Sequence, residues 1–200
     1  LTKFYGSRPA IRDVSFTVGR GEIVGFLGPN GAGKSTTMRI LAGFLAATEG
    51  TVRIAGHDVA GASREVRRRV GFMPENNPLH SDMRVREYLK FRARLKGLSR
   101  QASRDRVDEV IEQFDLTDAA RQMIGELSKG FRQRVGLADA LVHEPAVIIL
   151  DVPTIGLAPH QVRTVRQCIK QLADNHTVLI SSHILPEVEV TCTKLMIFHE

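Results

Sequence analysis

The protein has 200 residues, 42% of them hydrophobic and 25% charged, which suits one globular domain with a sizeable core. Its formal net charge of +6 would suit a nucleotide, an anionic lipid or a nucleic acid, and selects none of them. The longest apolar stretches, 23–27 and 146–150, are too short to span a bilayer, and the two cysteines lack metal or redox spacing. The visible pattern therefore excludes a transmembrane helix and a disulfide scaffold as the basis of this domain.

The N-terminal part of the chain predicts strands and one helix. Residues 14–18 and 22–27 are rich in Val, Ile and Phe and flank Gly19-Arg20-Gly21, which predicts two strands joined by a turn. The second strand leads into a glycine-rich loop, and apolar residues at helical spacing follow at 37–45. Two further short strands are predicted, at 51–54 and 70–73.

From about residue 80 to 142 the apolar spacing is helical. Three helices are expected there, the first capped by Ser81 or Asp82, the second by Ser103, and the third by Ser128 and ending near Val142. After this region the pattern returns to alternating elements. These are strands at 146–150, 177–181 and 194–198 and a helix at 160–173.

Strands that alternate with helices predict an α/β fold with a mostly parallel, covered sheet. Antiparallel strands are expected near the N-terminus, and the helical stretch predicts a subdomain inserted at approximately 76–142 of a single domain, 1–200. The chain does not begin with Met, and Glu200 closely follows an apolar segment. We therefore expect a chain that is cut at both ends.

Residues 28–35, GPNGAGKS, match the phosphate-binding pattern G-x-x-x-x-G-K-[ST] in full, between a predicted strand and a predicted helix. Glycines let the backbone N–H groups turn toward an anion, and the helix start adds partial positive charge. Lys34 would neutralise phosphates and Ser35 would offer its hydroxyl to Mg²⁺. The pattern predicts a P-loop NTPase whose nucleotide contacts are Gly28, Pro29, Asn30, Gly31, Ala32, Gly33, Lys34, Ser35 and Thr36.

Asp151 ends the apolar run 146–150, which reads as a buried strand. In open α/β sheets ligands bind beyond the carboxyl ends of the strands, so Asp151 is expected beside the phosphate loop. There its carboxylate would hold Mg²⁺ through water. Alternatively, Asp151 could only cap a loop, but the phosphate loop upstream disfavours this interpretation.

Further motifs occur in the order of one family. LSKGFRQR at 127–134 resembles the signature of ATP-binding cassette (ABC) ATPases, and SSH at 181–183 resembles their switch histidine, here His183. MPENNP at 73–78 resembles the loop that usually carries Gln, here Glu75, and Tyr5 fits the aromatic residue that stacks on adenine. Over essentially its whole length the chain resembles ABC ATPases, and most of all the bacterial exporter branch.

The resemblance implies cofactors and partners. ATP and Mg²⁺ would be held between the phosphate loop of one ATPase domain and the signature of a second, in a homo- or heterodimer. The signature residues facing the partner's ATP would be Ser128, Lys129, Gly130 and Phe131. Closure would drive a separate membrane permease, received near Glu75 and the helical subdomain, at the cytoplasmic face of the membrane. Nucleic acid is not expected, because the basic run 64–69 lacks interleaved aromatic residues.

The resemblance also assigns chemistry. Lys34, Glu75, Asp151 and His183 are the expected catalytic residues, and Ser35, Glu75 and Asp151 are the expected metal ligands. Two of the expected site residues also have a simpler interpretation. Tyr5 could be an ordinary half-buried aromatic residue, and His183 could be a solvated side chain, as a lone His often is. Glu75 could also hold the attacking water, although the family position mostly coordinates the metal.

Two family residues are missing. Where the pattern has a Glu after the strand this chain has Val152, and where it has an Asp at the end of the following loop this chain has Ala158. Val152 cannot accept a proton, but it suits a strand end, so we expect both changes to impair ATP hydrolysis and to leave the packing intact. Two alternative functions stay open: a non-hydrolytic nucleotide switch, and a soluble ABC protein acting on ribosomes or DNA.

Overall fold

The computed structural model describes residues 1–199, and at its centre five strands form a parallel sheet. The spatial order is β6-β7-β8-β3-β9, which differs from the order in sequence. The expected α/β fold with a mostly parallel sheet is confirmed. The bounds are β3 Ile23–Leu27, β6 Val70–Met73, β7 Val147–Asp151, β8 Thr177–Ser182 and β9 Lys194–Ile197.

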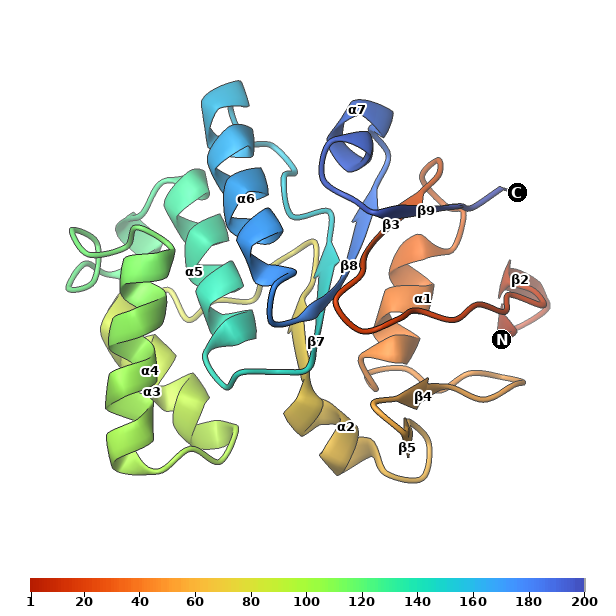
Figure 1. The fold of residues 1–200 in the computed structure, drawn as a ribbon, viewed down its shortest axis with the longest axis horizontal. Helices are drawn as coiled ribbons and strands as arrows, with labels where there is room; N and C mark the ends of the chain where they lie inside the picture. Colours follow the sequence, from red (N-terminus) through yellow and green to blue (C-terminus); the bar gives the residue numbers. More distant parts are fainter. Residues whose placement is uncertain (200) are drawn as a thin grey trace.

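Helices cover both faces of this sheet, as Figure 1 shows, with α5 and α6 on one side and α1 on the other. Successive side chains of a strand point to opposite faces, so Ile148 and Leu150 join one apolar cluster while Ile149 joins the other. This explains why the strands read as continuous apolar runs. The helices are α1 Lys34–Leu41, α2 Ser63–Arg69, α3 Val85–Leu95, α4 Arg100–Gln113, α5 Lys129–Leu141, α6 Pro159–Leu172 and α7 Leu185–Glu189, with a 3₁₀ turn at Ile124–Glu126.

The antiparallel strands lie outside the central sheet. They form two small pairs, β1 Lys3–Tyr5 with β2 Arg8–Ile11 and β4 Arg53–Ile54 with β5 His57–Asp58. The strand predicted at 14–18 is wrong, because this segment joins no β-ladder. Its alternation has a different cause: Val14, Phe16 and Val18 are half-buried while the residues between them are exposed, and Phe16 packs edge-on against Phe26.

Two of the three predicted helix caps in the middle of the chain are wrong. The first helix begins after Arg84 rather than after Ser81 or Asp82. The second begins after Ser99, whose hydroxyl accepts a hydrogen bond from the N–H of Ala102 at 3.1 Å, while Ser103 is buried inside the helix. The third cap, Ser128, is confirmed, and that helix ends at Leu141.

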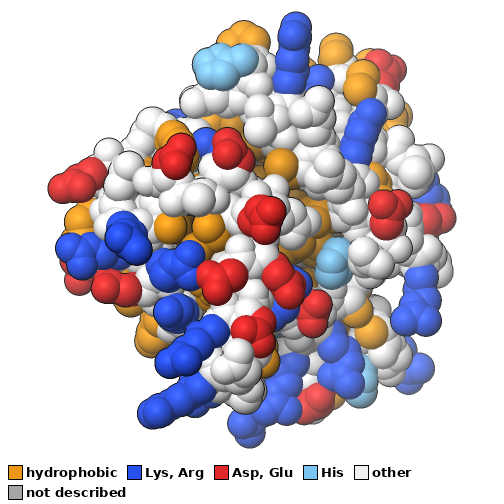
Figure 2. All heavy atoms as spheres, turned by 60° about the vertical axis from the view of Figure 1, so that its left-hand side comes forward, with side chains coloured by type: hydrophobic (Ala, Val, Ile, Leu, Met, Phe, Trp, Pro, Cys, Tyr) orange, Lys and Arg blue, Asp and Glu red, His pale blue; other side chains and the backbone are white. Residues whose placement is uncertain are grey.

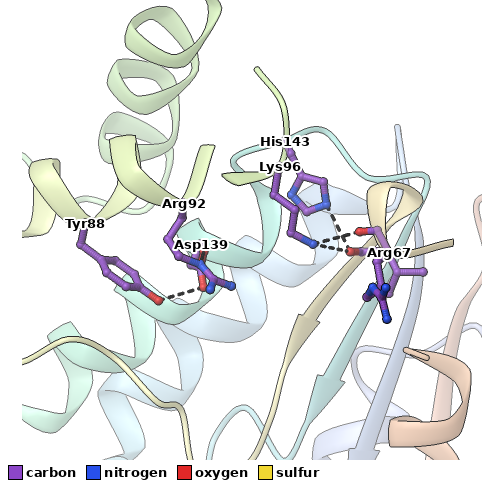
Figure 3. A network of polar contacts seen from close by, with 7 residues as sticks. Arg67, Tyr88, Arg92, Lys96, Asp139 and His143 are labelled. Carbon is purple, nitrogen blue, oxygen red and sulfur yellow. Dashed lines mark hydrogen bonds and ion pairs between the residues drawn. The ribbon is translucent and has the colours of Figure 1, made fainter. Parts of the chain in front are cut away.

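A polar network joins the helical part of the chain to the edge of the sheet (Figure 3). Tyr88 and Arg92 on α3 donate to the two carboxylate oxygens of Asp139 on α5, at 3.0 and 2.7 Å. One turn further on, the ammonium of Lys96 donates to the carbonyl of Arg67 at 2.9 Å and to that of Val70, in the edge strand β6, at 3.3 Å. These bonds hold α3 against both α5 and the end of α2, so the helical part is anchored at two points.

Figure 2 shows the side of the molecule on which the helical part lies, with Asp and Glu grouped near its centre and Lys and Arg along its lower edge. Within the helical part, Arg86 on α3 pairs with Asp108 on α4, and both side chains reach solvent. Exposed pairs of this kind contribute little to stability. Within residues 1–199, no helix combines the length and the apolar character needed to cross a membrane.

Candidate functional site

The phosphate loop lies between β3 and α1, as its sequence context predicts. β3 ends at Leu27 and α1 begins at Lys34, with Gly33 as the N-cap in a left-handed conformation at φ 90°. A Cβ on Gly33 would lie 2.5 Å from the carbonyl oxygen of Ala10, so only glycine lets the loop pass this close to β2. Pro29, Asn30 and Gly31 are exposed at the tip. The loop is thus closely packed at its helix end and exposed at its tip.

Lys34 lies almost buried beneath this loop. Its ammonium donates to the carbonyl oxygens of Gly28 and Pro29, each at 2.7 Å. Burial lowers the pKa of Lys34, while the nearby carboxylates of Asp151 and Glu75 oppose that shift. The charges of Asp151 and Glu75 therefore both act on Lys34.

Asp151 ends β7 and is only 1% exposed, beside the start of α1. Its Oδ1 accepts hydrogen bonds from the hydroxyls of Ser35 at 3.1 Å and Ser181 at 2.5 Å. Its Oδ2 is buried and has no hydrogen-bond partner among the described residues. A buried carboxylate oxygen without a partner is costly unless it meets a cation or water.

This donor set fits Mg²⁺. Carboxylate and hydroxyl oxygens are the hard ligands that the ion prefers, and Mg²⁺ is usually bound by one or two protein carboxylates together with phosphates and waters. Residues 1–199 contain no cluster of three or more His, Cys, Asp or Glu side chains that could hold a metal unaided. Asp151 with Ser35 suits an ion that takes its remaining ligands from a nucleotide and from water.

The other predicted site residues lie around this centre. His183 directly follows β8 and is exposed, and Glu75 is half-buried in the loop after β6. Tyr5 ends β1 and is 52% exposed, with the ammonium of Lys3 5.6 Å from its ring centroid. A groove of about 950 Å³ runs between residues 8–16, the phosphate loop at Gly31 and Ala32, and β9, but Tyr5 does not line it. The adenine role of Tyr5 stays a prediction.

The predicted signature forms the start of α5. The Ser128 hydroxyl accepts a hydrogen bond from the N–H of Phe131 at 3.4 Å, and both Ser128 and Lys129 are exposed. The guanidinium of Arg134 lies 4.3 Å from the centroid of the Phe131 ring, which fixes the aromatic side chain against the helix. Gly130 is buried. The exposed pair leaves the helix start accessible to an anion.

Contacts that sequence reasoning missed tie this helix start to the loop after β7. Gln133 on α5 donates to the carbonyl of Pro153 at 2.6 Å. Gln161 on α6 packs its amide over Gly130, so closely that a Cβ there would lie 2.3 Å from Nε2. The ammonium of Lys129 similarly covers Gly156. Gln161 had a sequence signal, since Gln three residues after a helix cap is a capping-box pattern, whereas Gln133 had none.

The structure contradicts the expectation that Val152 suits a strand end. The residue follows the strand in a left-handed conformation, at φ 47°, and is 8% exposed. A β-branched residue in this region is strained, at a cost on the order of 1–3 kcal/mol. Val152 therefore does not fit its position as a residue in an extended strand would, because the chain turns here in a conformation that valine rarely adopts.

Ala158 lies at the start of α6, where a side chain can cap the helix. It is the N-cap of α6, and its side chain makes no capping hydrogen bond. Its own N–H donates to Oε1 of Gln161 at 3.1 Å. An aspartate here would cap the helix, so alanine costs the helix about 0.5–2 kcal/mol. Alanine at 158 therefore leaves the first turn of α6 without a side-chain cap.

Comparison with known protein families places these observations in context. A family model described as "ABC transporter" matches residues 11–155. The bacitracin transport ATP-binding protein BcrA of Bacillus licheniformis is 39% identical over 202 residues, which cover 100% of this chain and 65% of that protein. The ABC transporter ATP-binding protein NatA of Bacillus subtilis is 38% identical over 192 residues, which cover 95% of this chain and 78% of that protein.

Solved structures agree with this comparison. The structure of the ATP-binding subunit of an ABC transporter has a TM-score of 0.89 at 30% identity and covers 100% of this chain and 83% of that one. A dimeric bacterial ABC transporter cassette has a TM-score of 0.88 at 27% identity, covering 98% of this chain and 91% of that one. The chain spans about two thirds of the length of several relatives, as the 65% coverage of BcrA illustrates.

Proposed function

Because the chain belongs to the ABC transporter family of ATP-binding proteins, we propose that it is the ATP-binding subunit of a bacterial exporter-type transporter, with slow or absent hydrolysis. ATP and Mg²⁺ bind between the phosphate loop of one ATPase domain and the signature of a second, and closure acts on a membrane permease. Two relatives are named as ATP-binding proteins of transporters, and a similar cassette is dimeric. Both observations support this class of function.

In this proposal each site residue has a defined task. The loop 28–33 and Lys34 bind the phosphates, with Thr36 following in α1. Ser35 and Asp151 hold Mg²⁺, with Glu75 as a further ligand, and the ion neutralises charge on the phosphates. His183 contacts the γ-phosphate of the chain's own ATP. Ser128, Lys129, Gly130 and Phe131 face the partner's ATP.

The observation that carries the slow-hydrolysis proposal is the side chain at position 152. The residue directly follows the metal-binding Asp151, where the family pattern has the glutamate that polarises the attacking water. Val152 offers only methyl groups, and its backbone N–H is held by the hydroxyl of Ser181 at 2.9 Å. Positioned general bases contribute roughly 10²–10⁴-fold to rates, or about 3–5 kcal/mol of barrier.

The permease is proposed to dock near Glu75 and the helical subdomain. Large apolar side chains are exposed on α3, with Phe91 at 41% and Leu95 at 63% exposure. Phe44, whose ring lies 5.3 Å from that of Phe72 in β6, is 66% exposed. The ring of His80, in the loop after Glu75, lies 5.9 Å from that of Phe91. Exposed apolar side chains of this kind are typical of interaction surfaces. Docking there would place the protein at the cytoplasmic face of the membrane.

A second candidate function is a nucleotide switch that regulates a partner without turnover. Val152 and Ala158 together favour it, because one removes the general base and the other removes the carboxylate that reaches across the dimer in the family. The two candidates differ in whether ATP is consumed. Measured turnover therefore separates them.

The test is steady-state phosphate release with Mg-ATP and the permease, for the unmodified chain and for Val152→Glu. We expect release close to the background for the unmodified chain and an increase of roughly 10²–10⁴-fold for the variant. Val190→Glu is the matched control, because Val190 is 58% exposed and lies after α7 rather than at the site. Brisk turnover by the unmodified chain would contradict the slow-hydrolysis proposal.

A further inference from the structure

Ser181 is a completely buried serine at the end of β8, next to the proposed magnesium ligand. β7 and β8 are parallel neighbours, and their register sets Asp151 directly beside Ser181. The Ser181 side chain is 0% exposed, and its hydroxyl is 2.5 Å from Oδ1 of Asp151. The pairing is thus built into the sheet rather than made by a mobile loop.

The Ser181 hydroxyl donates one hydrogen bond and accepts another. It donates its proton to Oδ1 of Asp151 and accepts the N–H of Val152 at 2.9 Å. A serine hydroxyl has one proton, so its donor is used entirely on the carboxylate. Oδ1 also receives the hydroxyl of Ser35 at 3.1 Å, whereas Oδ2 receives no hydrogen bond from the described residues. The two carboxylate oxygens therefore have different surroundings.

The second bond holds the chain where it leaves the strand. Val152 has a φ of 47°, a conformation that valine adopts only when its surroundings impose it. The Ser181 hydroxyl is the acceptor for the N–H of this residue. One side chain therefore holds both the Asp151 carboxylate and the backbone that follows it.

We propose that Ser181 is a positioning residue for the magnesium site. By bonding Oδ1 it fixes the rotamer of Asp151 and leaves Oδ2 without a protein partner, free to bind the ion or its water. Partners that orient a metal ligand in this way typically change metal affinity by 10–100-fold when they are removed. The inference rests on the proposed binding of ATP with Mg²⁺.

The neighbouring residue Ser182 provides a matched control. Ser182 is also buried at the end of β8, at 3% exposure. Its hydroxyl accepts the N–H of Ile184 at 3.0 Å and lies 3.3 Å from Oε2 of Glu187. Ser182→Ala therefore removes the same group from the same strand end without removing a bond to Asp151.

The experiment measures ATP affinity by equilibrium titration, once with Mg²⁺ and once with EDTA, for the unmodified chain, Ser181→Ala and Ser182→Ala. The ratio of the two dissociation constants is the readout, because a loss of fold or of general packing would change both constants together. We expect Ser181→Ala to reduce, by about 10–100-fold, the increase in ATP affinity that Mg²⁺ causes. The dissociation constant measured with EDTA should stay unchanged. Ser182→Ala should keep the ratio of the unmodified chain.

Ser181→Cys is the second variant, because sulfur fills the buried space but is a weak hydrogen-bond donor. It is expected to lose the gain from Mg²⁺ as Ser181→Ala does, so the test remains available if the alanine variant does not fold. An unchanged ratio in a folded Ser181 variant, or an equal loss in Ser182→Ala, would overturn the inference. An unmodified chain that binds no ATP in either buffer would overturn the proposed function itself, together with this inference.

Discussion

His143 is a buried imidazole whose protonation state is decided by its hydrogen bonds. Its Nε2 lies 3.1 Å from the carbonyl oxygen of Val70, which can only accept, so Nε2 carries the proton (Figure 3). Its Nδ1 is buried and has no partner among the described residues. A second proton on Nδ1 would be a buried donor without an acceptor, beside the ammonium of Lys96.

This environment predicts a pH dependence of stability. Burial first, and then the charge of Lys96, lower the pKa of His143 from 6.5 to about 3. Between these values the unfolded chain binds a proton that the folded chain does not, so the free energy of unfolding decreases as pH falls below 6.5. The expected decrease is at most about 1.4 kcal/mol per pH unit, measured by urea denaturation between pH 7.5 and 5.

His143→Gln isolates this contribution, because glutamine keeps an N–H donor and does not titrate. The difference in stability between the two proteins should change with pH below 6.5 and be constant above it. Parallel pH profiles for both proteins would show that His143 does not take up a proton on unfolding in this range.

At the scale of single residues, sequence patterns identified types of chemistry but not partners. Asp151 was predicted as a metal ligand because it ends an apolar run before a loop. Ser181 was not predicted, although it belongs to the SSH motif, because its role depends on the register between β7 and β8. The left-handed backbone of Val152 was also missed, since a valine after an apolar run ordinarily indicates continued strand.

At the scale of elements, α6 is a helix with an incomplete start. Its N-cap, Ala158, has no side-chain acceptor, although Pro159 at the first position and Gln161 at the third are typical of a helix start. Helix starts bind negative charge and accept capping side chains. α6 is therefore less stable than it would be with a capping side chain at position 158.

Ala158→Asp is expected to raise the free energy of unfolding by about 0.5–2 kcal/mol, because the carboxylate accepts an N–H of the first turn. Chemical denaturation measures the change. Ala158→Asn separates hydrogen bonding from charge, since asparagine caps without adding a negative charge. If both variants were no more stable than the unmodified chain, the side chain at 158 would not cap α6.

The helix boundaries show why sequence predicted some elements well and others poorly. Ser128 was predicted correctly because it stands next to the first apolar residues of its helix and keeps its capping bond. The pattern predicts Ser103 as a cap because apolar residues at helical spacing follow it, whereas the observed cap is Ser99. The side chain of Ser103 is instead buried against α3, where the hydroxyl lies 3.4 Å from the carbonyl oxygen of Lys90. The local sequence pattern does not distinguish a capping serine from a buried one, because the packing of one helix against another decides which role the serine takes.

At the scale of the whole molecule, the proposed site would be completed by a second ATPase domain. The tip of the phosphate loop, the signature residues Ser128 and Lys129, His183 and Ala158 are all exposed. In a homodimer both ATP sites would lack the glutamate and the cross-dimer aspartate. In a heterodimer this chain's own site would lack the glutamate, and the opposite site would lack the aspartate.

A homodimer should therefore form with Mg-ATP and persist, because little ATP is hydrolysed to release it. Light scattering after size exclusion is expected to give a dimer with Mg-ATP and a monomer without it. Ser128→Arg should weaken dimerisation at least tenfold, because the side chain would block the signature from the partner's ATP.

Ser99→Arg is the control for the dimer experiment. Ser99 is the N-cap of α4, and its hydroxyl makes the same kind of bond as Ser128, so both variants lose one helix cap. The control should dimerise as the unmodified chain does. If the unmodified chain stayed monomeric at high concentration with Mg-ATP, the closed homodimer would be wrong and a heterodimer would become the working hypothesis.

The sequence by itself determined the family, the order of the motifs and the residue types proposed to bind phosphate and metal. These features depend on short stretches in which spacing alone defines the chemistry, as in residues 28–35. Only the tertiary structure decided how Asp151 is held, why position 152 is left-handed, and how α5 is tied to the loop after β7. Those features depend on which strands become neighbours, and the order β6-β7-β8-β3-β9 brings together residues that lie far apart in the chain.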